Sequence, residues 1–553
     1  MSLDLQAFLA VCPILTAGVF LIGLRWPARR VMPLAFVLTC IIALFLWDVS
    51  WSQVAASAIQ GLFITFDILF IVFGAIFLLN TLNQSGAIGT IRAGFSDITP
   101  DRRIQVIIVC WLFGSFIEGA AGFGTPAAIV APLLIALGFP AVAAVMLGMM
   151  VQSTAVTFGA VGTPVLVGVR GGLENADVLQ ALSNKGQSIQ DYLQIIASNA
   201  ALFHAIAGTV MPLLMCMMMT RFFGERRSWR EGLKAFPFAI FGGLAFTMPY
   251  YLTARYLGPE FPSMIGAMVG MLVVVTAAKR KILQPTEIWD FAPNQQWPDH
   301  WTGQFKFDQA TEPRKMSLSK AWLPYILVAF LLVLTRIPQL PIKSFLTSVR
   351  FSWPDIFSTD ITAATTPLYL PGTVLLLVIV ITYFFHSMSR ESFGKAFHES
   401  GKMLLGAGFV LVFTIPMVRI YINSGTNLAE LPSMPLAMAE WAAVHVGAIW
   451  PLFAPMIGAL GAFIAGSNTV SNLMFCLFQY GVADNLSLPT TVIVSLQAVG
   501  AAAGNMVAIH NVVAASATVG LLGQEGSTLR KTIIPTLYYL IIVGILGIVF
   551  TWT

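Results

Sequence analysis

Long apolar segments recur along the whole chain and are separated by short polar stretches. Several approach 20 residues, the length that a helix needs to cross a hydrocarbon core of about 30 Å. The first, Leu5 to Leu24, lacks the basic start and small-residue cleavage site of a secretory signal, so we expect a retained helix. Further spans are predicted near Leu34, Ile68, Phe203, Ala239, Val269, Ile326, Leu376, Val410 and Ile541. The pattern predicts an all-α polytopic membrane protein with about 11 full spans.

One apolar region is interrupted where a span should be continuous. After Arg103 the chain is apolar for about 14 residues, too few to cross. It then meets Glu118–Pro126, becomes apolar again as far as Gly138, and is followed by a second apolar run that is broken at Gly159–Pro164. We therefore predict a re-entrant hairpin over residues 104–138 and a broken transmembrane helix over residues 140–169.

A second region near the C-terminus has the same organisation. Its apolar sequence is interrupted at Gly466–Thr469, returns towards Asp484, and continues after Pro489 to a break at Gly504-Asn505. This pattern predicts a hairpin over residues 450–482 and a broken helix over residues 489–522.

The two regions match in detail. Gly114–Ala120 is similar to Gly461–Ser467, and each is followed by a proline, a glutamine and a glycine in the same order: Pro140, Gln152 and Gly159 in the first, Pro489, Gln497 and Gly504 in the second. Duplicated broken segments are typical of secondary transporters, which bind substrate where half-helices meet near the bilayer midplane. We expect two repeats of opposite orientation, with one hairpin entering from the cytoplasm and the other from outside.

This organisation divides the chain into five parts. We assign N-terminal spans to 1–56, the first repeat to 57–222, middle spans and connecting loops to 223–371, the second repeat to 372–530, and a C-terminal span to 531–553. The hydrophilic stretches Gln284–Lys315 and Pro338–Thr365 are short and Pro-rich, so we interpret them as connectors or surface helices.

Composition supports lipid as the main solvent. Hydrophobic residues make up 57% of the chain and charged residues 10%, whereas soluble proteins have roughly 25% charged residues. The net charge of +5 comes from Lys and Arg in short loops, which is the orienting bias of a membrane protein and not a nucleic-acid footprint. We place six basic loops, including Arg25–Arg30 and Arg221–Lys234, in the cytoplasm and both termini outside. The five cysteines lie in apolar runs without metal-ligand spacing, so we expect packing residues and no metal site.

The motifs of the two regions resemble those of a known family. GSFIEGAAGFGTP at Gly114–Pro126 and GAFIAGSNTVSN at Gly461–Asn472 look like the lactate permease family, and further agreement lies in Ile98–Asp101, Gly504–Met506 and Ala517–Gly520. The resemblance extends from the first span to the last. It implies proton-coupled uptake of L-lactate and related 2-hydroxy monocarboxylates, such as glycolate and D-lactate, in a bacterial inner membrane. It also implies an ion-transporter-like fold in which Ser-Asn-Thr at a hairpin tip binds a carboxylate or a cation.

Hairpin tips and helix breaks supply the binding candidates. They leave backbone N–H groups without partners, and helix N-termini carry partial positive charge, so a small carboxylate can bind there. The substrate-binding candidates of this kind are Ala120, Ala121, Gly122, Gly162, Thr163, Ser467, Asn468, Thr469 and Asn505. The alternative is that these small residues only allow close helix packing.

Three titratable residues are candidates for proton coupling. Glu118 lies between apolar arms, where an acid is costly and usually marks an ion path, although it could also be a hydrogen-bonded acid that fixes the hairpin tip. Asp67 is the other intramembrane acid and could form a structural pair with a neighbouring helix. His510 follows the second break and is a candidate to titrate with substrate; the alternative is a hydrogen-bonded packing histidine. His204 and His445 are solitary in apolar surroundings and have weaker claims.

Arg419 is the remaining substrate-binding candidate. It lies late in an apolar span, and the planar guanidinium of an arginine can bind both oxygens of a carboxylate. It could instead extend to the outer surface a few residues away.

Several functions remain open from the sequence. The first is a proton symporter working by alternating access, with an elevator-like movement. The second is a sodium-coupled carboxylate transporter, because hydroxyls and unwound carbonyls suit that ion. The third is a passive anion channel. We expect no enzyme activity, because the chain has no HExxH motif or other paired catalytic residues in neighbouring spans. The expected partners are the carboxylate substrate, the lipid bilayer and a second copy in a homodimer; no cofactor is expected other than the coupling ion.

Overall fold

A computed structural model describes residues 1–20, 24, 26, 28–96, 98–122, 124–302, 316–336, 340–521 and 524–552. The elements of the N-terminal part are helices, with short 3-10 or π-helical segments named η. They are α1 (Leu3–Gly18), α2 (Ala28–Phe45), α3 (Trp51–Gln84), α4 (Ala87–Ser96), α5 (Arg102–Gln105), η2 (Val106–Phe113), α6 (Gly114–Ala121), α7 (Thr125–Ala136), α8 (Ala141–Met150), η3 (Val156–Phe158), α9 (Gly159–Thr163), η4 (Pro164–Val169), α10 (Arg170–Leu173), α11 (Ala176–Asn184), α12 (Ile189–Gly208) and α13 (Met211–Phe223).

The middle part holds α14 (Trp229–Leu233), α15 (Phe236–Tyr256), α16 (Pro262–Lys279), η5 (Asn294–Gln296), η6 (Asp299–Trp301), α17 (Leu318–Arg336), α18 (Ile342–Ser348), β1 (Phe351–Trp353), η7 (Ile356–Ser358), β2 (Ala363–Thr365) and η8 (Pro367–Tyr369). The C-terminal part holds α19 (Pro371–Phe385), α20 (Arg390–Asn423), α21 (Met434–Val446), η9 (Gly447–Ile449), α22 (Trp450–Ala465), α23 (Asn468–Asn485), α24 (Thr490–Gly504), η10 (Asn505–Val507), α25 (Ile509–Thr518) and α26 (Glu525–Trp552).

The described chain contains fewer full spans than the sequence predicts. Nine helices are long and apolar enough to cross a membrane, or up to ten if the two parts of α20, bent by 40°, form one span. The prediction of about 11 full spans is therefore too high, because several apolar runs form shorter helices. The first of these is α1, which has only 16 residues, and α19 has 15.

The prediction of an all-helical chain holds with one small exception in the described residues. β1 and β2 form an antiparallel pair in which Ser352 lies opposite Ala364. The pair lies in the Pro338–Thr365 stretch that we expected to hold only connectors or surface helices, although α18 in the same stretch is such a helix.

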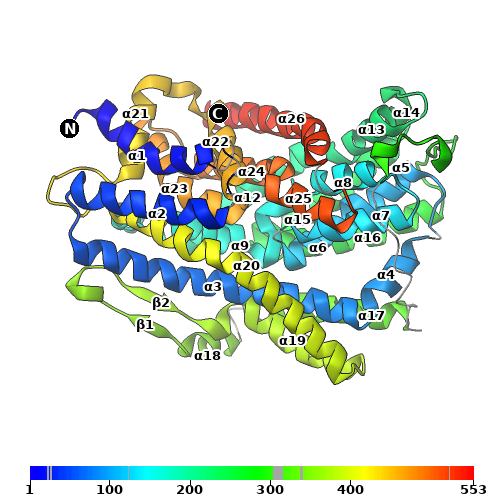
Figure 1. Cartoon of the computed structure of the whole chain (residues 1–553), viewed down its shortest axis with the longest axis horizontal. Coiled ribbons are helices and arrows are strands. Elements are labelled where there is room, and N and C mark those ends of the chain that lie inside the picture. The colour runs from blue at the N-terminus through cyan, green and yellow to red at the C-terminus, as the bar shows by residue number, and fades with distance from the viewer. Residues whose placement is uncertain are drawn as a thin grey trace.

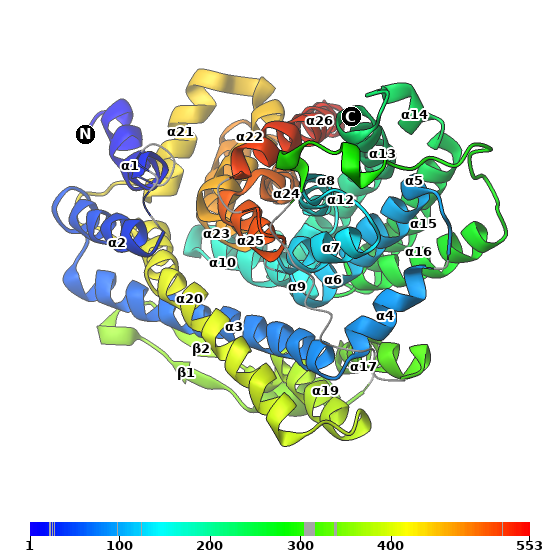
Figure 2. The same cartoon turned by 45° about the vertical axis from the view of Figure 1, so that its right-hand side comes forward.

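Two long helices lie along one side of the molecule. α3 and α20 have 34 residues each and pack against one another (Figure 1). They cross closely, because a Cβ added to Gly61 would lie 2.5 Å from the Cα of Pro416. Figure 2 shows this pair beside the bundle that contains α6, α7, α9, α23 and α25.

The bundle is built from the two interrupted regions of the sequence, which we call the first broken region (Arg102–Leu173) and the second broken region (Met434–Thr518). The first arms pack within their own region, with α6 on α9 and α22 on α24. The second arms also reach the other region, because α7 packs on α25 and α23 packs on η4 and α10. The two regions are therefore interlocked.

The arms differ from the predicted half-length in one case. α5, η2 and α6 follow one another without a gap from Arg102 to Ala121, and these 20 residues are long enough to cross a membrane. α7 is shorter, with 12 residues. The chain turn between α6 and α7 is present where the sequence predicts it, since α6 ends before Gly122, whose φ is +59°.

The start of the first arm is fixed by a buried ion pair. Arg103 Nη2 lies 2.6 Å from Asp101 Oδ2, and the same guanidinium donates to the backbone carbonyls of Glu231 and Glu287. Both side chains are nearly inaccessible. A buried pair with satisfied hydrogen bonds fixes geometry well, so the entry to α5 is held against the connecting segment after α16.

Candidate functional site

The turns that follow α6 and α22 and the two helix breaks meet at one small cavity. Its lining residues come from α6, η3, α9 and η4 of the first broken region and from α22–α23 and η10 of the second; they are Glu118, Gly122, Val156, Gly159, Ala160, Pro164, Gly466, Ser467, Asn468, Thr469 and Asn505. The cavity has a volume of about 20 Å³. That is enough for about one water molecule.

The wall from the first broken region has an unusual backbone. Ala160, Val161 and Gly162 have φ values of 42°, 55° and 78°, three consecutive residues in the left-handed region. A positive φ is a strong outlier for a β-branched residue such as Val161 and costs free energy. Such strain persists only where the surroundings enforce it, and it is concentrated at functional sites.

Close packing at the tip enforces this backbone. A Cβ added to Gly122 would lie 2.8 Å from the Cβ of Ala160, and one added to Gly159 would collide with Oε1 of Glu118. A Cβ on Gly162 would lie 2.5 Å from the carbonyl oxygen of Pro259. The glycines thus allow the hairpin tip to touch the broken turn.

Glu118 is the ionisable residue among those that line the cavity. Its side chain is 2% exposed, and its Oε2 atom has no hydrogen-bond partner among the described residues. Oδ1 of Asn505, on the opposite wall, also has none in the described part of the chain. Buried polar atoms are normally paired, so these two are available to a ligand, a proton or water.

The wall from the second broken region ends in a helix N-terminus. α23 has 18 residues, and its N-cap residue Ser467 makes no side-chain capping bond. The residues that begin this helix line the cavity. Uncapped N–H groups and the helix dipole make such a terminus suited to an anion.

Hydrogen bonds join the two walls. The Nδ2 atom of Asn472 donates to Oδ1 of Asn468 at 2.7 Å and lies 3.2 Å from the carbonyl oxygen of Pro164. Asn468 Nδ2 in turn lies 3.3 Å from the carbonyl oxygen of Ala498. The second hairpin is therefore tied to the break of the first region.

A buried polar network lies behind η3. Nε2 of His204 lies 2.7 Å from Thr157 Oγ1, and its Nδ1 lies 2.6 Å from the Tyr539 hydroxyl. The same hydroxyl lies 3.0 Å from Oγ1 of Thr154. This network holds the turn that carries Val156 to the cavity. The sequence signal for it was weak, because Thr157 and Tyr539 are far from His204 along the chain.

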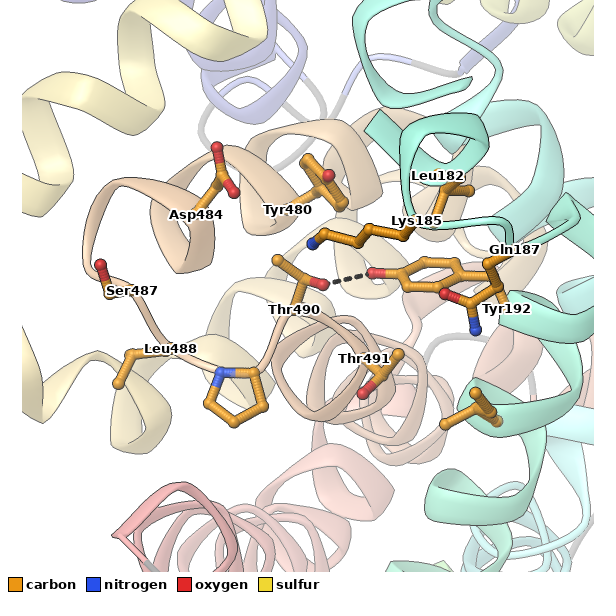
Figure 3. A pocket seen from close by; sticks show the side chains of 12 residues that line it. Leu182, Lys185, Gln187, Tyr192, Tyr480, Asp484, Ser487, Leu488, Thr490 and Thr491 are labelled. Carbon is orange, nitrogen blue, oxygen red and sulfur yellow. Dashed lines mark hydrogen bonds between the residues drawn. The ribbon is translucent and has the colours of Figure 1, made fainter. Parts of the chain in front are cut away.

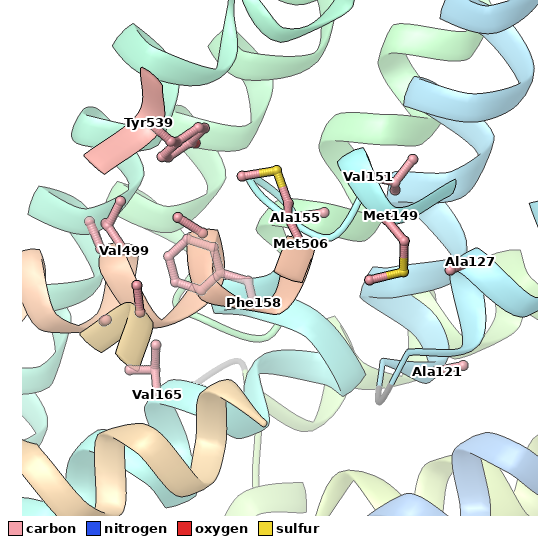
Figure 4. Close-up of a cluster of buried hydrophobic side chains, with 14 of the residues drawn as sticks. Ala121, Ala127, Met149, Val151, Ala155, Phe158, Val165, Val499, Met506 and Tyr539 are labelled. Carbon is pink, nitrogen blue, oxygen red and sulfur yellow. The ribbon is translucent and has the colours of Figure 1, made fainter. Parts of the chain in front are cut away.

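Apolar side chains surround this polar centre. Figure 4 shows Phe158, Val165, Val499 and Met506 gathered between the broken helices, with Ala121 and Ala127 at the first hairpin. All six are buried. A dry shell of this kind strengthens the electrostatic interactions inside the cavity.

The structure places the predicted site residues in three groups. Among the binding candidates, Gly122, Ser467, Asn468, Thr469 and Asn505 line the cavity, as does the coupling candidate Glu118. Ala120, Ala121, Gly162 and Thr163 are sequence neighbours of lining residues. Val156, Gly159, Ala160, Pro164 and Gly466 also line it and were not among the candidates.

The third group lies elsewhere. Arg419 and Asp67 are not among the lining residues; Arg419 donates to four protein oxygens, and Asp67 accepts a hydrogen bond from Thr365 of β2. His510 belongs to α25, but its side chain lies outside the described residues.

A second, larger pocket of about 420 Å³ lies between α12 and the loop that joins α23 to α24 (Figure 3). Lys185, Tyr192 and Thr490 are among its lining residues, and the Tyr192 hydroxyl donates to Thr490 Oγ1 at 2.6 Å. It contains none of the predicted site residues, and its Lys185 and Asp484 are exposed.

Comparisons with known proteins agree with the membrane architecture. A putative L-lactate permease of Haemophilus influenzae is 29% identical over 94% of this chain and 93% of its own length. The glycolate permease GlcA of Escherichia coli K12 is 26% identical over 99% of this chain and 95% of its own. The crystal structure of the Alcanivorax borkumensis YdaH transporter covers 94% of this chain and 98% of its own with 13% identity and a TM-score of 0.42, a likeness too loose to carry an argument.

The family profile decides the assignment. The profile of the L-lactate permease family matches residues 6–552, nearly the whole chain. With its apolar spans, this match makes the protein a multi-pass transporter of the bacterial inner membrane and not an enzyme. The chain belongs to the L-lactate permease family.

Proposed function

We propose that this protein takes up small 2-hydroxy monocarboxylates, lactate and glycolate above all, together with protons. The substrate class follows from the names of its relatives, which are lactate and glycolate permeases. The observation that carries the coupling is the shared cavity: an acid without a partner in the described chain, Glu118, lies across from the uncapped N-terminus of α23.

The two walls have complementary tasks in this proposal. The N–H groups at Asn468 and Thr469 bind the substrate carboxylate, and the Ser467 hydroxyl and Asn505 amide bind its 2-hydroxyl group. Glu118 holds the proton that travels with the anion. An anion and a proton that move together carry no net charge across the low-dielectric interior, which is the least costly way to move a carboxylate.

The size of the cavity supports alternating access. A hydroxy acid has several heavy atoms, whereas the cavity of about 20 Å³ has room for about one water molecule. The substrate therefore enters by separation of the hairpin tips from the broken helices. We propose that the two broken regions are inverted repeats with re-entrant hairpins, and that they move together, elevator-like, against the rest of the protein.

Uptake of labelled lactate into proteoliposomes tests the proposal. We expect accumulation above the external concentration when the outside is more acidic, and competition by glycolate. An acidic external medium must also stimulate uptake when choline replaces sodium. Uptake that ignores the proton gradient contradicts proton coupling, and uptake that never exceeds equilibrium indicates a passive channel.

Sodium coupling is the second candidate, and the acceptors of the cavity favour it. Oε2 of Glu118, Oδ1 of Asn505 and the hydroxyls of Ser467 and Thr469 are oxygen ligands of the kind that a hard cation prefers. Loss of accumulation on replacing sodium with choline at constant pH would select this candidate.

A further inference from the structure

Arg419 is buried away from the cavity and is fully engaged with other parts of the protein. Its side chain is 1% exposed. Nε donates to Gln60 Oε1 at 2.8 Å, Nη1 to the carbonyl oxygen of Gly171 at 2.7 Å, and Nη2 to that of Glu174 at 2.9 Å. A buried guanidinium is tolerated only when its donors are satisfied in this way.

Two of these acceptors lie at the C-terminal end of a half-helix. η4 and α10 run without a gap from Pro164 to Leu173, and the carbonyls of Gly171 and Glu174 lie at the end of this segment. The last carbonyls of a helix have no partner within it and carry partial negative charge, so a cation there is favourable. Arg419 caps the segment from another helix, α20.

The opposite end of the same half-helix forms the site. Pro164 lines the cavity and lies two residues after Gly162, the last residue of the left-handed turn. One rigid segment thus has one end at the substrate cavity and the other in the hydrogen bonds of Arg419. A helix transmits a displacement of one end to the other.

One side of the half-helix lies directly against α23. It packs on α23 through glycines: a Cβ added to Gly168 would lie 2.8 Å from the carbonyl oxygen of Thr469, and one added to Gly171 would lie 2.7 Å from a Leu473 methyl carbon. Glycine faces allow close approach but provide no interlocking side chains. The cavity end of the segment is held by the bond from Asn472 to the carbonyl of Pro164, and the bonds from Arg419 hold its other end.

The anchor itself is rigid. Asn423 Nδ2 donates to Gln60 Oε1 at 3.0 Å and to Ser57 Oγ at 3.1 Å, so the residues around Arg419 on α3 and α20 are held to one another. The close crossing of Gly61 and Pro416 lies beside this cluster. Arg419 is thus oriented before it bonds to the half-helix.

We propose that Arg419 is a positioning residue that anchors the η4–α10 half-helix to the α3–α20 pair and thereby sets the position of Pro164 and the strained turn at the cavity. Its effect on substrate rests on the proposed function, but the anchoring does not. Arg419 in this role contacts no substrate.

The test uses two readouts on the full-length protein in proteoliposomes. A cysteine probe replaces Val167, a half-buried residue of η4, in a chain whose Cys12 and Cys40 are changed to Ala. The rate at which a small maleimide modifies this cysteine is measured without substrate, and the half-saturation and maximal rate of lactate uptake are measured on the same variants with Val167 intact.

Arg419→Lys keeps the charge but loses the planar fork, so it cannot hold both carbonyls and Gln60. We expect labelling about tenfold faster and a half-saturation about fivefold higher, with the maximal rate per folded protein within about twofold. Arg350→Lys, at an exposed arginine, is the matched control and leaves both unchanged. Gln60→Met, which removes one acceptor of Arg419, moves both readouts in the same direction by about threefold and serves if Arg419→Lys does not fold.

Each other outcome overturns the proposal. Unchanged labelling with a raised half-saturation means that Arg419 contacts the substrate itself. Faster labelling with an unchanged half-saturation means that it only stabilises the fold, and no change in either variant means that it anchors nothing. Because labelling needs no substrate, a wild-type protein that takes up no lactate contradicts the proposed function and leaves the anchoring test valid.

Discussion

The first and second broken regions have the same plan but different chemistry. In both, a turn between two helices and a helix break reach the cavity. At the matched positions the first has Glu118 and Ala120, and the second has Ala465 and Ser467. One region therefore contributes the acid, and the other contributes the hydroxyl and the uncapped helix N-terminus.

The backbones of the two helix breaks also differ. The break in the first region passes through three consecutive left-handed residues, whereas the break in the second is a single 3-10 turn at Asn505–Val507 with negative φ at Asn505. Strain is thus confined to the wall that carries Glu118.

The hydrogen bonding of a matched pair of glutamines also differs between the two regions. Gln497 accepts from Gln479 Nε2 at 3.1 Å and donates to Ser471 Oγ at 3.1 Å. The matched Gln152 is fully buried, and neither its Oε1 nor its Nε2 has a partner among the described residues. The glutamine of the second region is therefore part of a hydrogen-bonded frame, whereas its counterpart in the first region has no such frame in the described chain.

Removing the acid should have the largest effect. We expect Glu118→Gln to lose proton stimulation and to lower lactate uptake by about 100-fold, since a positioned proton-transferring side chain contributes at least that much. Glu391→Gln, at an exposed acid in the first turn of α20, is the control. Retained proton dependence in Glu118→Gln would remove this residue from the coupling role.

A methyl group at the matched glycines should separate function from folding. Gly159→Ala displaces the Glu118 carboxyl group, a movable side chain, so we expect uptake to fall by about tenfold or more in a folded protein. In Gly504→Ala, the new methyl group would collide with the backbone of Ala459 on α22. Because this backbone cannot move aside, the variant should lose about 1–3 kcal/mol of stability. Uptake and the apparent Tm in detergent measure the two effects. If both variants lose stability equally, the contrast between the walls is wrong.

The hydroxyl at the second tip should matter for affinity. Ser467→Ala removes one hydrogen bond to the 2-hydroxyl group of the substrate, and a bond between neutral groups contributes about 0.5–1.5 kcal/mol, so the half-saturation for lactate should rise about fivefold. The reciprocal change Ala120→Ser, at the matched position of the first tip, should leave it within about twofold. Competition by unlabelled lactate during uptake gives both numbers, and equal effects would indicate that the tips share the binding.

The glutamine pair should show the smallest and most specific contrast. Gln497→Leu removes the hydrogen bonds to Gln479 Nε2 and Ser471 Oγ, which keep only their bonds to backbone carbonyls, and should destabilise the protein by about 1–3 kcal/mol. Gln152→Leu replaces a side chain without partners in the described chain and should be neutral or stabilising. Thermal unfolding in detergent compares them. A marked loss of stability in Gln152→Leu would show that its polar atoms are paired, for example through water.

The elements of this fold that could be predicted depend on local sequence. Apolar runs predicted the spans, and Gly and small polar residues predicted the breaks at Gly122, Gly159 and Gly466. The exact number of spans could not be predicted, because hydropathy does not show that α1 ends at Gly18 after 16 residues. Nor does any propensity favour the left-handed conformation of Val161, which packing alone enforces.

The site residues divide in the same way. The sequence placed Glu118, Asn505 and Ser467–Thr469 in one site because each lies at a break. It could not place Arg419, whose acceptors on Gly171 and Glu174 are 248 and 245 residues away and are backbone carbonyls without a sequence signature. It also could not distinguish Gln152 from Gln497, which occupy equal positions and differ only in their neighbours.

The interlocking of the second arms has a consequence for biosynthesis. The bond from Asn472 to the carbonyl of Pro164 joins residues 308 positions apart, and a Cβ added to Gly168 or Gly171 would meet α23. During translation, the N-terminal half is therefore inserted into the bilayer with these glycines uncovered until α23 has been synthesised. A nascent chain that stops before α23 exposes these glycines to lipid, to membrane chaperones and to quality-control proteases.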